Sequence, residues 1–224
     1  MRKLPGGALL ALGLVALAPR GLRAQVAGLP VINSGVARGL GLALDVGIPN
    51  DNAGGGFAVG TTAGVGFGAL GVTARVSRFD PELGTELWSG GATANYKVFG
   101  GPLVPLAVTL QAGAGYASPE FACVPPGACD INTWRFPVGL GVAFTIPNPA
   151  LAIKPWVAPR IDITRTSVDD VAETESEFGI SGGIELNTIT GFGLQAAYDL
   201  VSRDGGSPGI FSAGLHYSFR IPGL

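Results

Sequence analysis

Large apolar side chains occur at every second residue through most of this 224-residue chain. In the segment 37–48, Leu40, Leu42 and Leu44 share one parity, and the other parity holds almost only Gly and Ala. The segment 134–146 repeats this pattern. A period of two places successive side chains on opposite faces of a β-strand. The strands therefore have one large apolar face and one face of unusually small side chains.

The connections between these segments alternate in length. The longer and more polar ones cover residues 49–55, 80–86, 118–132, 167–177 and 202–209. Short turns at one end and long loops at the other are typical of transmembrane β-barrels. We therefore predict an all-β fold, a closed antiparallel up-and-down barrel of about ten strands, with eight strands as the alternative. The first and last strands then have their free ends on the short-turn side.

Three prolines fall within predicted strands. Pro137, Pro155 and Pro159 cannot donate to a β-ladder, so we expect bulges or local breaks in pairing there.

The composition favours a lipid-facing exterior. Only 13% of the residues are charged and 37 are Gly, whereas soluble proteins have roughly 25% charged residues. Beyond residue 24, no apolar stretch reaches the roughly 18 residues of a membrane helix, but a barrel strand needs only about 10. A soluble, lipocalin-like barrel is the alternative, and it would have too few surface charges to stay in solution.

The N-terminus has the pattern of an export signal. Arg2 and Lys3 precede a short apolar core at 8–18, and Ala24 ends a candidate cleavage site. The apolar core is about half the length of a bilayer span, which argues against an uncleaved anchor. We predict a signal peptide at 1–24, a short periplasmic segment at 25–33 and the barrel at 34–224.

Export changes what the remaining residues can do. Loss of the basic signal peptide makes the chain more acidic than its formal net charge of −2, so nucleic acid is not an expected partner. In an oxidising compartment a disulfide between Cys123 and Cys129 is the default. A metal site there is the alternative, but no His or second Cys pair lies nearby. No cofactor is expected.

The last predicted strand, 210–221, carries Tyr217 and Phe219 on its apolar face. Together with the export signal and the alternating strands, it resembles the small outer-membrane barrels of Gram-negative-type bacteria, the OmpA-like, OmpW-like and opacity-type group. The resemblance implies location in the bacterial outer membrane, contact with outer-membrane lipid, and assembly by the barrel assembly machinery. In this family the terminal strand ends on an aromatic residue, whereas this chain continues through residues 220–224.

Most strand charges fall on the small-residue face, which we predict to be the lumen. Buried charges need partners, so we expect a polar plug, with a narrow porin-like channel for small solutes as the alternative. This inward set comprises Asp45, Arg75, Lys97, Gln111, Arg135, Lys154, Arg160, Asp162, Glu185, Gln195, Asp199, His216 and Arg220.

Catalysis is not expected. His216 and Ser218 form a His-x-Ser pair similar to that of outer-membrane lipid A deacylases, but the pair has inward parity, whereas those enzymes act from the lipid-facing side. A hydroxyl nucleophile also needs a base that a carboxylate orients, and nothing in the sequence places one there. An omptin-like protease would need clustered acidic residues and a His near the loop rim, whereas His216 lies in the middle of a predicted strand.

The loop at 167–177 is the most acidic one. We expect it to be a solvated surface loop, and binding of divalent cations or of a basic partner is the alternative. Its acidic residues are Asp169, Asp170, Glu173, Glu175 and Glu177.

An aromatic girdle is expected near the long-loop ends of the strands. Its members are Trp88, Trp134, Tyr116 and Phe79.

Overall fold

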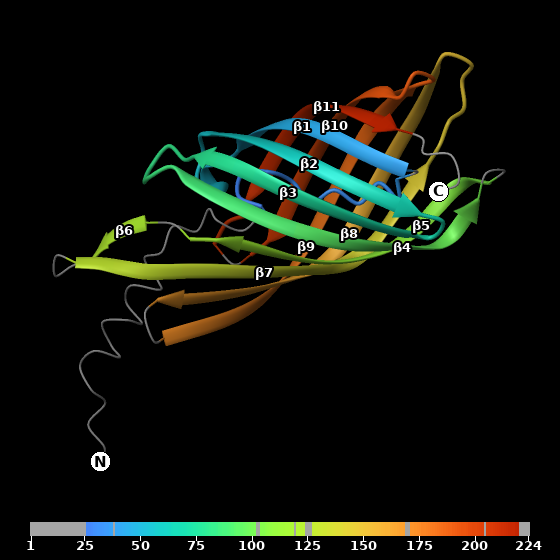
Figure 1. Cartoon of the computed structure of the whole chain (residues 1–224). Coiled ribbons are helices and arrows are strands. Elements are labelled where there is room, and N and C mark those ends of the chain that lie inside the picture. The colour runs from blue at the N-terminus through green and yellow to red at the C-terminus, as the bar shows by residue number, and fades with distance from the viewer. Residues whose placement is uncertain are drawn as a thin grey trace.

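The strands form one antiparallel sheet that closes on itself (Figure 1). The computed structural model describes residues 26–37, 39–101, 104–118, 120–123, 127–168, 171–203 and 205–219. Its elements are β1 (Gly39–Pro49), the short 3-10 helix η1 (Asp51–Ala53), β2 (Phe57–Phe67), β3 (Leu70–Asp80), β4 (Leu87–Gly101), β5 (Val104–Ala117), β6 (Glu120–Cys123), β7 (Gly127–Phe144), β8 (Leu151–Val168), β9 (Val171–Thr188), β10 (Phe192–Ser202) and β11 (Gly209–Phe219).

Ten of these strands make the barrel, as predicted. β1 pairs with both β2 and β11, and β5 pairs with both β4 and β7, so the ring has no open edge. Closure pairs the backbone polar groups between strands, which a strand inside a membrane requires. β6 pairs only with β7 and lies outside the ring. Leu40 of β1 pairs with Phe219 of β11, which places the start of β1 and the end of β11 together on the short-turn side.

The prolines do not shift the strand register, so no bulge forms there, but pairing is locally broken beside two of them, as predicted. Within the described strands, Pro137 has no partner on β5, and Pro159 has no partner on β7. Pro155 and Pro159 pair with Ile184 and Ile180 in one continuous β8–β9 register. Each residue of an antiparallel ladder directs its N–H to a single neighbour, so one proline removes at most one bond. The register shifts instead between β4 and β5, at residues 97–101.

Three neighbouring strands extend beyond the rest of the barrel at the long-loop end. β7, β8 and β9 each have 18 residues, whereas β1, β2 and β3 have 11. Two predicted loops are therefore largely strand: 118–132 contains β6 and the start of β7, and in 167–177 Val168 already pairs with Val171. The ends of β6 and β7 project from this rim in Figure 1.

The outer face of the barrel is apolar. Leu44 is 54% exposed and Leu140 is 43% exposed, each near the middle of its strand. A closed barrel with such an exterior is suited to lipid contact. Within the described residues, no helix is long and apolar enough to cross a membrane.

Aromatic side chains cluster at both ends of this apolar surface. At the long-loop end, Tyr116 contacts Trp134 with ring centroids 4.9 Å apart, and Trp88 is exposed nearby on β4. At the short-turn end, Tyr217 lies between Phe192 and Phe219, with ring centroids 4.5 and 4.4 Å apart. The assignment of Phe79 to the outer girdle was wrong: its parity points inward, and it is buried.

Candidate functional site

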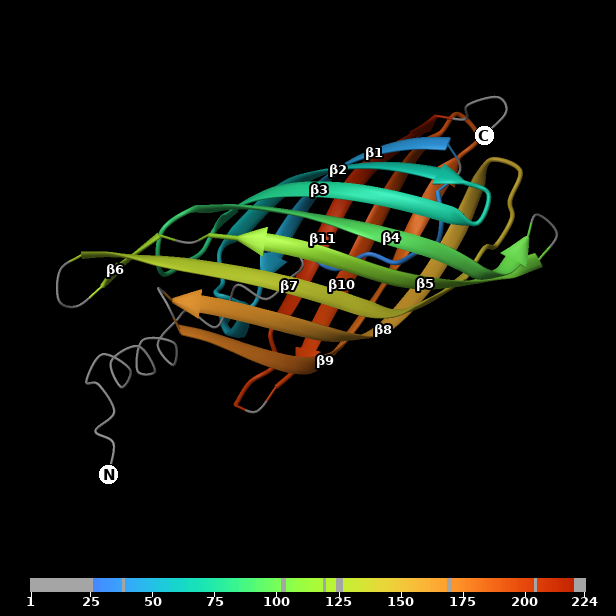
Figure 2. The ribbon, with the colours of Figure 1, turned by 60° about the horizontal axis from the view of Figure 1, so that its bottom comes forward.

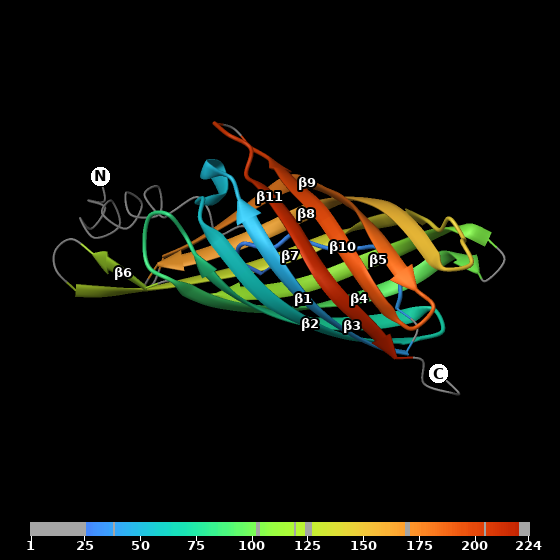
Figure 3. The same ribbon diagram turned by 90° about the horizontal axis from the view of Figure 1, so that it is seen from above.

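The lumen contains a segment of the chain itself. Residues 26–37 lie inside the ring of strands and lead directly into β1 (Figures 2 and 3). Within it Val26, Leu29 and Val31 are almost completely buried. A periplasmic segment was predicted at 25–33, whereas residues 26–33 lie within the barrel. We call residues 26–37 the lumenal segment.

The lumenal segment begins with a tight turn near the long-loop end. The Leu29 amide donates to the Val26 carbonyl at 3.2 Å, and Gly28 has a φ of 71°. A positive φ at the third residue is the mark of a type II turn, and it favours glycine. The turn packs in a dry apolar cluster formed by Ala27, Leu29, Ala58, Phe79, Leu87 and Ala117.

The small inward face of the barrel makes room for the segment. A Cβ atom at Gly66 would overlap the carbonyl oxygen of Ala37, and one at Gly141 would lie 2.7 Å from Oδ1 of Asn33. The other wall glycines in contact with the segment are Gly47, Gly60, Gly71 and Gly91. The glycine-rich face therefore does more than narrow the lumen: it lines a groove for a polypeptide.

Wall side chains bind the main chain of the lumenal segment near its first residues. The amide of Ala27 donates to Oγ of Ser89 at 2.7 Å, and Oγ of Ser77 donates to the carbonyl of Ala27 at 2.8 Å. Ser77 and Ser89 also hydrogen-bond each other at 2.9 Å. These bonds satisfy backbone groups that burial would otherwise leave unpaired.

Farther along, three different parts of the wall bind residues 30–32. Arg75 Nη1 donates to the Pro30 carbonyl at 2.7 Å. The Val31 amide donates to Oδ2 of Asp199 at 2.8 Å. Gln111 Nε2 donates to the Ile32 carbonyl at 2.9 Å. The segment is thus held from β3, β10 and β5 at once.

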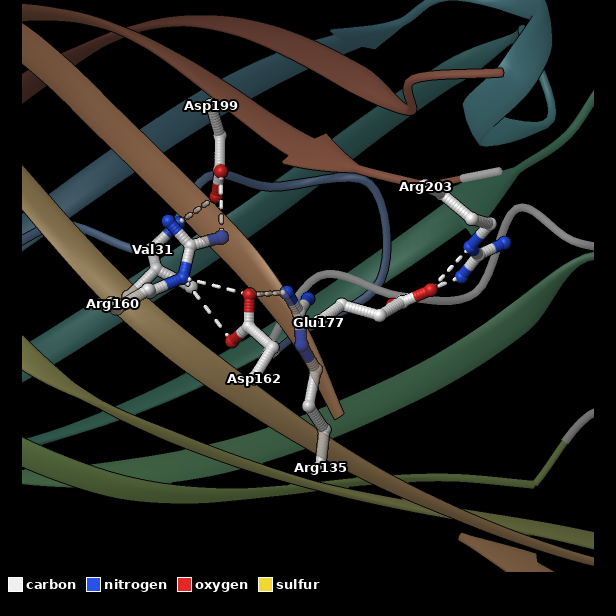
Figure 4. Close-up of polar contacts among 7 residues, drawn as sticks. All are labelled: Val31, Arg135, Arg160, Asp162, Glu177, Asp199 and Arg203. Atoms are coloured by element: carbon white, nitrogen blue, oxygen red, sulfur yellow. Dashed lines mark hydrogen bonds and ion pairs between the residues drawn. The ribbon is translucent and has the colours of Figure 1, made fainter. Parts of the chain in front are cut away.

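A buried ionic network lies on β7, β8 and β10 (Figure 4). Arg160 lies between two carboxylates: its Nε is 3.0 Å from Oδ2 of Asp162, and its Nη2 is 2.6 Å from Oδ1 of Asp199. Arg135 Nη2 donates to the same Oδ2 of Asp162. Because Asp199 also accepts from Val31, the network connects the wall to the lumenal segment.

Two further ion pairs lie elsewhere in the lumen. Arg75 Nη2 is 3.4 Å from Oδ2 of Asp45, whose other oxygen accepts from Gln195. Lys154 Nζ is 3.3 Å from Oε2 of Glu185. Most of the charged residues predicted to point inward therefore pair with one another, which is what burial requires.

Other predicted site residues take different places. Lys97 is partly buried and forms no ion pair with a described residue. Glu173 is exposed and Glu175 half-buried on β9, and Glu177 forms an ion pair with Arg203 (Figure 4). Arg220, Asp169, Asp170 and the side chains of Cys123 and Cys129 lie outside what the structure describes.

The loops at the long-loop end contain exposed charges. Arg78 donates to Glu86, and this hydrogen bond holds the pKa of Glu86 below its usual value. Exposed pairs of this kind contribute little to stability.

The histidine of β11 lies beside a side-chain amide. His216 Nε2 lies 2.9 Å from Oδ1 of Asn187, an amide and not an orienting carboxylate. Across the described part of the chain, no group of His, Cys, Asp and Glu side chains is arranged to hold a metal ion.

Sequence reasoning missed the lumenal segment. Its sequence, VAGLPVINSGVA, contains no charged residue and directly precedes the first strand. One feature of the sequence could have indicated it. The inward face has an excess of glycine, which leaves more space in the lumen than the charged side chains fill.

Comparison with solved structures returns small outer-membrane barrels. They include the N-terminal β-barrel domain of Pseudomonas aeruginosa OprF (12% identity, 82% of this chain and 98% of that chain, TM-score 0.40) and Neisserial surface protein A (16%, 80% and 97%, 0.41). The outer-membrane protease OmpT from Escherichia coli also matches (10%, 81% and 94%, 0.39). No family model and no curated protein sequence matches the chain. The similarity is one of fold alone.

The turn that begins the lumenal segment gives a direct test of its packing. Gly28→Ala and Gly205→Ala both place a side chain at a positive φ (71° and 86°), but only Gly28 has wall atoms within reach of the new Cβ. We expect the left-handed conformation alone to cost about 1–2 kcal/mol at either site, and overlap with Ala58 to add to it at Gly28. Denaturant unfolding of both variants measures the difference; equal losses would contradict the packing.

Proposed function

We propose that this chain is an outer-membrane barrel closed by its own N-terminal segment, with a structural or interaction role at the cell surface. The observation that carries the proposal is the lumenal segment, which fills the space through which a solute would pass. An open channel needs a continuous aqueous path, and here buried Leu29 and Val31 lie within the lumen.

The polar groups of the lumen support closure as well. Arg160 pairs with both Asp162 and Asp199, and Arg135 also pairs with Asp162. Charged side chains that are bound in this way are held by their partners, so they are not free to bind ions that pass through the lumen. The extended β8–β9 hairpin, with exposed Glu173, is then the surface offered to other molecules.

The outer surface of the barrel supports a location of the protein in the bacterial outer membrane. The apolar exterior between two aromatic clusters supports a barrel that crosses a bilayer, and the longer loops are expected on the outer side. We further propose export by a cleavable signal peptide at 1–24, a Cys123–Cys129 disulfide between β6 and the start of β7, and no enzymatic activity.

Unblocking the lumen tests the proposal. Leu29→Asp places a carboxylate in the dry cluster beside Phe79 and Ala58, where an unpaired charge is too costly to bury, so the lumenal segment should leave while the wall stays unchanged. In planar bilayers the parent protein should be silent, and the variant should show steady conductance steps.

Leu83→Asp is the matched control, because Leu83 is 86% exposed in the β3–β4 loop; it should stay silent. Protease cleavage within 26–37, seen only in the Leu29 variant, verifies release of the segment. Steady conductance of the parent protein would overturn the closed barrel. A released segment without conductance would overturn its role in closure.

A further inference from the structure

The contacts of the lumenal segment have the character of a binding site. We propose that the lumen is a peptide-binding channel that takes an uncharged, extended peptide rich in small and β-branched residues, and that residues 26–37 are its resident ligand. The inference rests on the proposed closure by this segment and adds that the site recognises the peptide even when it is not part of the same chain.

Main-chain recognition is the first argument. Ser77, Arg75 and Gln111 all donate to carbonyl oxygens of the segment, whereas Ser89 and Asp199 accept from its amides. These five wall groups lie on four different strands, β3, β4, β5 and β10. Groups that bind the backbone do not require the peptide to be covalently joined to β1.

The second argument is the match in shape. Leu29 lies against Gly47 and Gly60, Val26 against Gly91, and Val36 against Gly71. Three of the larger side chains of the segment therefore face wall positions without a side chain, and Ile32 packs against a buried cluster that contains Trp156. A peptide with bulky residues at other positions would meet the walls, so the groove selects spacing as well as size.

The third argument is charge. The wall pairs its own ions at Asp45–Arg75, Lys154–Glu185 and the Arg160 network. Each carboxylate of these pairs is bound by an Arg or Lys side chain, so none is left for a basic peptide. A basic ligand charge would therefore be buried without a partner, so the channel excludes basic peptides. The resident segment itself contains no charged side chain.

The test uses the full chain. Refolded Leu29→Asp protein in detergent micelles is titrated against a synthetic peptide of residues 26–37 labelled with a fluorophore at its N-terminal end, and anisotropy reports binding. We expect saturable binding to the variant and none to the parent protein, whose own segment occupies the channel at high effective concentration.

Two control peptides separate recognition from partition into micelles. A scrambled peptide of the same composition, and the same peptide with Leu29→Asp, should each bind about tenfold more weakly or worse, because both lose the buried leucine contact. Equal binding of the three peptides, or equal binding to parent and variant, would overturn the inference. If the parent is silent and the variant conducts but binds no peptide, closure stands and only the peptide site fails; if the parent conducts, closure itself fails.

Discussion

Replacement of Arg160 by Met is expected to destabilise the barrel by about 3–5 kcal/mol, the usual cost of removing one partner from a buried ionic network. Met retains much of the side-chain volume, so the loss comes from charge. Without Arg160, the partner that remains among the described residues is the Val31 amide for Asp199 and Arg135 for Asp162. Urea unfolding in detergent, followed by tryptophan fluorescence, measures the change.

Two further variants test whether the loss comes from the buried charges. Arg165→Met removes an exposed arginine of the same strand and should change stability by no more than about 0.5 kcal/mol. Adding Asp199→Asn to Arg160→Met should recover part of the loss, since the uncompensated carboxylate is then neutral. Arg160→Met with parent-like stability would show that the network does not hold the wall together.

Replacement of Leu44 by Arg is expected to cost about 2–4 kcal/mol in a bilayer, because a charge on the lipid face is most unfavourable at the midplane. Leu44 is 54% exposed at the centre of β1, and its cross-strand partners are Thr61 and Leu215. The measurement is unfolding by denaturant of protein folded into lipid vesicles.

Ile48→Arg is the matched control. Ile48 shares the strand and face of Leu44 and is 56% exposed, but it lies near the end of β1, so its cost should be only about 0–1 kcal/mol. Equal costs for the two variants, or a parent protein that stays in solution without detergent, would contradict a lipid-facing exterior.

The face on which each strand residue lies was predictable, because successive side chains of a β-strand alternate between its two faces. Once Leu40, Leu42 and Leu44 share a face, Asp45 must lie on the other, and the structure buries Asp45 and exposes Leu44. The ten-stranded closure followed from the alternation of connection lengths. Phe79 was misassigned because a position near a strand end was weighed above its parity.

Pairing across the lumen was beyond the reach of the sequence. Arg160 and Asp199 are far apart in the chain and meet only because β8, β9 and β10 are adjacent in the ring, in a fixed register. The sequence placed both on the inward face, but nothing local indicated that Asp199 would bind both Arg160 and the Val31 amide. Such contacts depend on the summed register of several strand pairs.

By itself, the sequence determined that this chain alternates large and small faces, that the large face suits lipid, and that the charges lie on the small face. These are consequences of strand geometry, which acts within a few residues. Only the tertiary structure decided what fills the barrel. Residues 26–37 have no pattern of their own, and their place is set by a glycine-lined space and by Ser77, Arg75, Gln111 and Asp199, which only the closed ring brings together.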